Sequence, residues 1–429
     1  MFSFKKAAAG VLSCTMLLGS LVISGCSDSN TSGAQSADNT SNGSSTAHQG
    51  EIKDISSVEL VKDMKIGWSL GNTLDGGNEV NRGQAPGAIE KSWGNPDTTK
   101  EMIDEIKKAG FNVLRVPTTW DWSTGEAPEY KISDEWFARV KEIVDYGMEN
   151  DMYVILNIHH ETWHDPLEAN YEAASDRLKK VWTQIGNYFK DYDEHLIFEG
   201  LNEPRVRNSD EEWNGGSDAT REVVNKLDAD FVSTIRSLDG NNKLRHLMIP
   251  GYAASSSEVA LKALKIPEND DKLIVSVHAY IPYNFALSDN KRSNKWVACK
   301  EGFTNDIDNL ADMLKTLFID KGQAVIIGEF GARSKDNEKY RAELAKYYVT
   351  KMKTVGVPCV WWDNGAFTGS GELFGLFDRR NLEWRYPLLK DALISASNGE
   401  YTVDGLKSDT AILDELKKDI AQSKNSSAE

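Results

Sequence analysis

Cysteine is scarce in this chain: its 429 residues include only four. Cys14 lies in an apolar N-terminal run and Cys26 follows that run, so only Cys299 and Cys359 remain beyond it. Two cysteines make neither a disulfide scaffold nor a cysteine-based zinc site. Spacing alone leaves open whether these two pair. The strand-like run around Cys359 favours a buried free thiol at that position.

Positive charge is also in short supply. Lys and Arg number 49 against 66 Asp and Glu, which gives a net charge of −17. The chain therefore lacks the basic footprint of nucleic-acid-binding proteins, and we expect no nucleic-acid partner. The sequence shows no EF-hand run and no G-x-G-x-x-G loop after a strand. We accordingly expect no bound metal and no cofactor, and we expect a monomer.

The N-terminus carries a targeting pattern. Lys5 and Lys6 precede an apolar run over residues 7–23 that ends in small residues, as secretory signals do. A transmembrane helix is the alternative, but the run is short, contains Ser and Cys, and no basic stop follows it. Ile23-Ser24-Gly25-Cys26 resembles the bacterial lipobox, with Ile at the position where Leu is usual. We expect residues 1–25 to be a lipoprotein signal peptide and the secreted protein to be anchored at the cell envelope by lipid on Cys26.

Both ends of the remaining chain are poor in core-forming residues. Residues 27–50 contain no Phe, Tyr or Trp and no aliphatic β-branched side chain. Such a stretch cannot bury a core, and we expect a flexible tether over residues 26–52. Residues 399–429 are polar, with a short helix expected around 411–421, and are predicted to be a tail. Residues 53–398 are left for one folded domain.

Within that domain, short apolar runs alternate with segments of helical periodicity. The runs are apolar throughout, as expected for parallel strands covered on both faces. Between them, apolar residues recur at helical spacing, for example at Ile307, Leu310 and Leu314. Eight such units predict a (β/α)₈ TIM barrel rather than an open doubly wound sheet. The predicted strands are 65–72, 112–118, 153–159, 196–202, 246–252, 273–280, 324–330 and 357–363.

Polar side chains gather at the C-terminal ends of these predicted strands. In a barrel, all of these ends face one bowl. Structural needs alone would not bring two carboxylates and several other polar groups there, because burying charge is costly. The residues concerned are Arg115, His159, His160, Asn202, Glu203, His278, Tyr280, Glu329 and Trp362.

Two carboxylates in one bowl point to glycoside hydrolysis. One must arrive protonated to assist the leaving oxygen, and the other must be ionised to attack the sugar or to activate water. Sharing a site drives their pKa values apart, because one negative charge disfavours the second. Arg115 and the Tyr280 hydroxyl are placed to keep one carboxylate ionised, and Asn202 to bind the sugar 2-OH.

These motifs resemble glycoside hydrolase family 5. The resemblance rests on residues 200–204 (Gly-Leu-Asn-Glu-Pro) and residues 327–331 (Ile-Gly-Glu-Phe-Gly), in the order set by the other strand-end residues. The motifs at residues 67–75 and 92–96 are similar to the bacterial endoglucanase branch of that family. The resemblance implies a retaining endo-β-1,4-glucanase, acting on cellulose, mixed-linkage glucan or xyloglucan. It assigns the nucleophile to Glu329 and the acid/base to Glu203.

The resemblance also implies a sugar-binding groove. Trp362 is expected to stack on the sugar at the cleavage site, with His159, His160, His278 and Asn72 beside it. Trp93, Trp122 and Trp163 are candidates for flanking subsites, and for each of the three, packing in a core or loop is an equally good interpretation.

Three other functions compete with this hypothesis. His160-Glu161-Thr162-Trp163-His164 matches the H-E-x-x-H motif of zinc proteases, but Pro166 disfavours the helix that this motif requires. A non-catalytic glycan-binding lipoprotein would be expected to lack one of the two carboxylates. A β-mannanase or xylanase on the same scaffold stays open, because loops rather than fold decide specificity.

Overall fold

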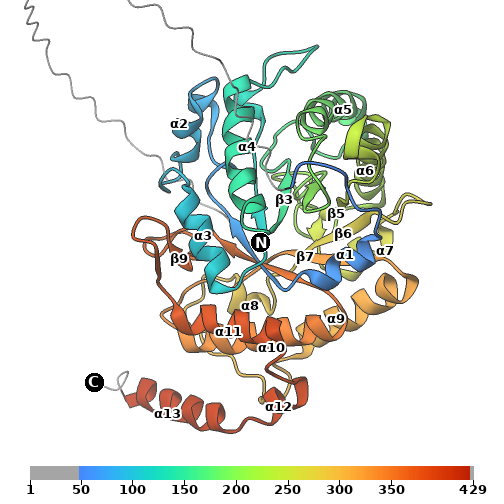
Figure 1. Cartoon of the computed structure of the whole chain (residues 1–429). Coiled ribbons are helices and arrows are strands. Elements are labelled where there is room, and N and C mark those ends of the chain that lie inside the picture. The colour runs from blue at the N-terminus through green and yellow to red at the C-terminus, as the bar shows by residue number, and fades with distance from the viewer. Residues whose placement is uncertain (1–47, 426–429) are drawn as a thin grey trace, which may run out of the picture. The chain divides into compact units, whose positions relative to one another are not determined.

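The eight strands close into one barrel. The computed structural model describes residues 48–425, and their side chains as far as residue 418. The strands pair in parallel and in chain order, and β8 returns to pair with β1 (Figure 1). The predicted (β/α)₈ barrel is thereby confirmed. Its strands are β1 Ile66–Leu70, β2 Val113–Val116, β3 Tyr153–Asn157, β4 Leu196–Glu199, β5 Leu247–Ser255, β6 Leu273–His278, β7 Ala324–Phe330 and β8 Cys359–Asp363.

Amphipathic helices form the layer around the barrel (Figure 1). In α9, for instance, Ile307, Leu310 and Leu314 are buried at helical spacing, as predicted. The longer helices are α3 Lys100–Ala109, α4 Asp134–Met148, α5 Tyr171–Tyr188, α6 Asp218–Ser237, α9 Asn305–Leu317, α10 Glu338–Thr354, α11 Pro387–Asn398 and α13 Ala411–Asn425. The shorter ones are α1 Ser57–Asp63, α2 Pro86–Glu90, α7 Glu258–Ala263, α8 Tyr283–Ala286 and α12 Val403–Ser408.

A few small elements complete the chain. A two-stranded antiparallel ladder joins β9 Phe377–Asp378 to β10 Glu383–Trp384. The 3₁₀ turns are η1 Glu79–Asn81, η2 Asp121–Ser123, η3 Glu168–Asn170, η4 Gly240–Lys243 and η5 Ile319–Lys321. Within residues 48–425, no helix combines the length and apolarity that crossing a membrane requires.

Apolar side chains close the N-terminal end of the barrel. Leu60, Val61 and Met64, on and just after α1, join inward-facing strand residues such as Ile155 and Ile326 in one buried cluster. A capping box at Ser56 begins α1, since Ser56 and Glu59 satisfy each other's backbone amides. The barrel is therefore plugged at this end, which leaves the opposite end for a site.

Ordered packing extends beyond the predicted domain at both ends. His48 is buried, and its ring nitrogens lie 2.9 Å from carboxylate oxygens of Asp193 and Asp151, although residues 26–52 were predicted to be a tether. Beyond residue 398, Leu406 of α12 and Leu416 of α13 are buried against the domain, so the predicted polar tail is in part a packed extension. The predicted signal peptide and Cys26 lie outside the described residues.

The two remaining cysteines are not bridged. Cys299 and Cys359 are both free thiols, and Cys359 is buried. Burial raises the pKa of the Cys359 thiol above its usual value, as expected of an inert core cysteine.

Candidate active site

Glu329 stands at the open end of the barrel, near the end of β7. One carboxylate oxygen accepts a hydrogen bond from the Arg115 guanidinium at 2.6 Å, and the other accepts one from the Tyr280 hydroxyl at 2.7 Å. Both oxygens are thus held in place. The carboxylate expected to attack the sugar has a fixed orientation.

Glu203 follows β4 at the same end. Its Oε1 accepts a hydrogen bond from Nδ1 of His278 at 2.8 Å, and its Oε2 lies 3.3 Å from the Arg205 guanidinium. The ladder between β6 and β7 shifts register just before His278, which then pairs with Glu329. Irregularities of this kind re-aim side chains next to active sites. His278 is thereby brought to both carboxylates.

The two carboxylates are close together. Oxygens of Glu203 and Glu329 and Nδ1 of His278 lie within 4.8 Å of one another. Retaining glycosidases hold their two carboxyl groups about 5–5.5 Å apart, and inverting enzymes about 6.5–9.5 Å apart, to admit a water. The spacing fits the retaining arrangement.

Arg115 connects the site to the barrel interior. This fully buried side chain contacts Glu329, donates from Nε to Glu199 at 2.9 Å, and donates from Nη2 to Asn202 at 2.8 Å. Ser276 and Asn157 also donate to Glu199, at 2.6 and 2.9 Å. Glu199 was not predicted as a site residue. It balances the charge of Arg115 and fixes its direction.

Electrostatics set the protonation of the groups around Glu329. Burial would lower the pKa of Arg115, but the carboxylates of Glu199 and Glu329 hold it above its usual value. Burial, and then the negative charge of Glu329, raise the pKa of Tyr280 well above its usual value. Arg115 stays charged and Tyr280 stays protonated, so both can donate to the Glu329 carboxyl oxygens.

The Glu203–His278 pair behaves differently. Burial favours the neutral carboxyl of Glu203, but the hydrogen bond and charge of His278 outweigh it, and the pKa of Glu203 lies below its usual value. Burial also disfavours a charged His278 ring, yet the carboxylates of Glu329 and Glu203 raise the pKa of His278. The two groups are thus coupled, and one proton can pass between Nδ1 of His278 and Oε1 of Glu203.

Trp362 forms part of the floor of the bowl. Its ring is parallel to that of His159, with an interplanar angle of 3° and centroids 5.9 Å apart. Gly71 also lies against the indole, where an added Cβ would come within 2.7 Å of the outer atoms of its six-membered ring. Glycine is required at position 71 because the backbone approaches the indole so closely.

Two histidines on the loop after β3 share one buried carboxylate. Nε2 of His159 and Nε2 of His160 lie 4.0 and 3.9 Å from Asp75. Asn157 donates to Nδ1 of His159 at 3.0 Å, which leaves the proton on Nε2. Burial lowers the pKa of His159 well below its usual value, so the ring is neutral. Asp75 and Asn157 support the site and were not predicted.

The family model for cellulase, glycosyl hydrolase family 5, matches residues 75–368. This chain belongs to glycosyl hydrolase family 5. It is 49% identical over 349 residues to Endoglucanase B of Neocallimastix patriciarum, a match covering 80% of this chain and 72% of that one. It is 45% identical to Endoglucanase A of Ruminococcus albus, with 81% and 94% covered. The chain is therefore a glycoside hydrolase.

Solved structures of family 5 share this fold. A GH5-4 broad-specificity endoglucanase from Ruminococcus champanellensis with bound cellotriose superposes with a TM-score of 0.77 at 43% identity, covering 80% of this chain and 99% of that one. A family 5 lichenase from Caldicellulosiruptor sp. F32 superposes with a TM-score of 0.76 at 42% identity, covering 82% and 97%.

The three tryptophans predicted as candidates for flanking subsites differ in how exposed they are. Trp93 is 42% exposed and its ring lies 5.5 Å from that of His160, so it is available to a sugar at this family 5 site. Asn72 is partly exposed, and its carbonyl accepts a hydrogen bond from Asn95 at 2.8 Å. Trp122 is 8% exposed, with Arg82 over its ring and Gly77 against it, and these contacts favour loop packing. Trp163 is partly buried under Arg177.

The H-E-x-x-H segment does not form a helix. Strand β3 ends at Asn157 and the next helical turn begins at Glu168, so residues 160–164 are loop. Glu161 accepts hydrogen bonds from the Trp120 amide and the Trp163 indole, and burial raises its pKa to about 7. Within the described chain, no group of three metal-ligating side chains includes His164. A zinc-protease site is thus not assembled in this family 5 fold.

Proposed function

We propose that this family 5 enzyme is a retaining endo-β-1,4-glucanase with Glu329 as nucleophile and Glu203 as acid/base. The observation that carries the proposal is the short separation of the two carboxylates, each with its own set of partners. Glu329 is oriented by donors that cannot protonate it at neutral pH. Glu203 is instead hydrogen-bonded to His278, a group that can supply a proton.

In the first step, Glu329 attacks the anomeric carbon and the bond from that carbon to the leaving oxygen breaks. Glu203 gives a proton to the leaving oxygen, so the departing chain leaves as an alcohol. Arg115 and Tyr280 hold the attacking carboxylate in line. Asn202, anchored by Arg115, is placed to bind the sugar 2-OH, a contact that strengthens in the transition state.

In the second step, water displaces the glycosyl ester from Glu329. Glu203, now ionised, takes a proton from that water as its oxygen attacks the anomeric carbon. The ester bond to Glu329 breaks and the carboxylate returns to its two donors. Configuration is inverted twice and therefore retained.

We infer that the substrates are β-1,4-linked glucans, including mixed-linkage glucan and xyloglucan. The relatives support this choice, because they are endoglucanases, a lichenase and broad-specificity endoglucanases, one with bound cellotriose. The Trp362 platform and the exposed Trp93 provide flat faces for pyranose rings.

The test is release of reducing sugar from mixed-linkage glucan, xyloglucan, carboxymethyl cellulose, xylan and mannan. Wild type is compared with Glu203→Ala and with Glu258→Ala, an exposed carboxylate on α7. Activity on the glucans that is lost only in Glu203→Ala supports the proposal. Activity confined to xylan or mannan would overturn the substrate assignment, and silence on all five would overturn the mechanism.

We further propose that lipid on Cys26 anchors the enzyme at the cell envelope. The support is the sequence of residues 5–26, with its paired lysines, apolar run and lipobox-like ending.

A further inference from the structure

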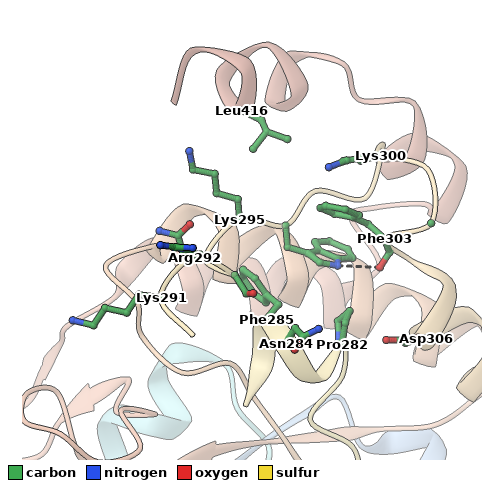
Figure 2. Close-up of a pocket in the computed structure, with 14 residues that line it drawn as sticks. Pro282, Asn284, Phe285, Lys291, Arg292, Lys295, Lys300, Phe303, Asp306 and Leu416 are labelled. Carbon is green, nitrogen blue, oxygen red and sulfur yellow. Dashed lines mark hydrogen bonds between the residues drawn. The ribbon is translucent and has the colours of Figure 1, made fainter. Parts of the chain in front are cut away.

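A second concavity lies outside the catalytic bowl. The loop between β6 and α9 and the helix α13 enclose a cleft of about 700 Å³. Figure 2 shows Leu416 reaching into it from α13, opposite Pro282, Asn284 and Phe285. Its volume falls within the range of about 300–1,000 Å³ of small-ligand sites. None of the catalytic residues lines it.

The cleft is cationic although the chain is acidic. Lys291, Arg292, Lys295 and Lys300 line it, against Asp306 as the one acidic lining residue, whereas the whole chain has a net charge of −17. Residues 291–300 contain no Asp or Glu. Among the side chains that the structure describes, these four have no carboxylate partner within 4.0 Å. Lys407, by contrast, is paired with Asp308 at 2.8 Å.

The wall of the cleft is built from buried groups. Trp296 is 2% exposed and donates from its indole to the Phe303 carbonyl at 3.0 Å, and Phe285 is 4% exposed. The buried Lys335 donates from Nζ to the carbonyls of Asn284 and Phe285, both at 2.9 Å, and thereby holds the loop in its curve. The cationic side chains therefore project from a frame that is fixed before any ligand arrives.

The residues that line the cleft favour a soluble, hydrogen-bonding anion as ligand over a lipid surface. A membrane would need exposed apolar side chains at this place, yet the rings of Trp296 and Phe285 are buried. Ser293, Asn284 and Asn294 also line the cleft and can bind hydroxyl groups. Cations around hydroxyl-binding side chains are complementary to a sugar that carries carboxylates.

We propose that this cleft binds an acidic oligosaccharide, with uronate carboxylates held by Lys291, Arg292, Lys295 and Lys300. That the ligand is a glycan rests on the proposed function, since a β-glucan-degrading enzyme meets its substrate among other polysaccharides. Binding would hold the enzyme on acidic polymer without occupying the bowl. No bond is made or broken in this cleft.

The test uses the full chain and measures its affinity for oligogalacturonate by calorimetry. The variant Lys291→Glu/Arg292→Glu/Lys295→Glu is compared with Lys65→Glu/Lys243→Glu/Lys321→Glu, three exposed lysines outside the cleft that change the total charge by the same amount. A Kd raised about tenfold or more in the first variant and unchanged in the second is expected. The triple Lys/Arg→Gln variant should fall between wild type and the charge reversal.

Further ligands and one assay distinguish the alternatives. Equal affinity for the fully methyl-esterified oligomer would overturn the carboxylate assignment. Binding of inorganic polyphosphate or phosphatidylglycerol vesicles without binding of oligogalacturonate would overturn the glycan assignment, and so would no binding at all. Hydrolysis of mixed-linkage glucan by the same preparations should be unchanged in both charge-reversal variants. If wild type does not hydrolyse mixed-linkage glucan, this result contradicts the proposed function but not the proposal that the cleft binds an acidic oligosaccharide.

Discussion

One imidazole serves both carboxylates: Nδ1 of His278 lies 2.8 Å from Glu203 and 3.6 Å from Glu329. The two negative charges hold the pKa of His278 above its usual value against the effect of burial. His278 is charged below that pKa and neutral above it. Below that pKa, His278 therefore holds a proton within hydrogen-bond distance of Glu203. The acid/base is then a pair, and its titration belongs to the pair.

Replacing His278 by Gln should therefore move the basic limb of the kcat/KM profile to lower pH. In wild type, activity falls when the pair loses its last proton, which occurs at the raised pKa of His278. In the variant Glu203 must hold that proton alone. The measurement is kcat/KM for a soluble β-glucan across pH, and an unchanged basic limb would mean that the proton resides on Glu203 throughout.

Glu329→Gln should lower kcat by about 10³-fold or more, because an amide cannot form the glycosyl ester. The fold should be kept, since the Gln amide oxygen can still accept from Arg115 and its NH2 group can donate to the Tyr280 hydroxyl oxygen. Glu258→Gln, which changes an exposed carboxylate on α7, is the matched control and should stay near wild type. Near-normal turnover in Glu329→Gln would remove Glu329 as the nucleophile.

Much of the site could be read from the sequence because strand ends converge in a barrel. Glu203, Glu329, Arg115, His278 and Tyr280 all follow or end predicted strands, and the structure brings them together. Their supporting partners, Glu199, Asn157, Asp75 and Arg205, were missed, because strand residues without their register show no partner. A signal for Glu199 did exist. It ends an apolar strand four residues before Glu203, and a buried charge there needs a counter-charge.

Glu199→Gln should lower the free energy of unfolding by about 3 kcal/mol, because it leaves the buried Arg115 with one carboxylate fewer. It should also lower kcat more than it changes KM, since Arg115 orients Glu329. Chemical denaturation monitored by tryptophan fluorescence measures the first effect. Asp97→Asn breaks a pair that is 52% exposed on each side and should cost less than about 1 kcal/mol. Equal losses in both variants would refute the role of Glu199.

The fold was predictable where periodicity is strong and less so at the ends. All eight predicted strands occur, most of them a residue or more shorter than expected, because capping and ladder geometry end a strand before its apolar pattern does. The C-terminal extension was underestimated. Among the described side chains beyond residue 398, Leu406 and Leu416 are buried against the core, and two leucines in a polar stretch give little signal.

Cys26→Ser should release the enzyme from the membrane fraction of cells that express the full chain, because the thiol is the proposed lipid acceptor. Immunoblots of membrane and soluble fractions measure this. Ser24→Ala, a change beside the cysteine that keeps a small residue, should leave partitioning as in wild type. Unchanged membrane partitioning of Cys26→Ser would refute the lipid anchor.

Chelation should leave hydrolysis of mixed-linkage glucan nearly intact. The carboxylates of Glu203 and Glu329 already have protein donors, so the proposed steps need no metal ligand. The measurement is the rate after prolonged dialysis against EDTA. Complete loss that zinc restores would contradict the proposed mechanism.

The buried His48 has a consequence for how the enzyme would present itself. It lies against Asp151 and Asp193, which precede β3 and β4, so the chain enters at the plugged end of the barrel. Residues 48–52 are thus held at the closed end of the barrel, opposite the end that carries both carboxylates. This segment therefore leaves the open end uncovered, and a long polymer can reach Glu203 and Glu329 without displacing it.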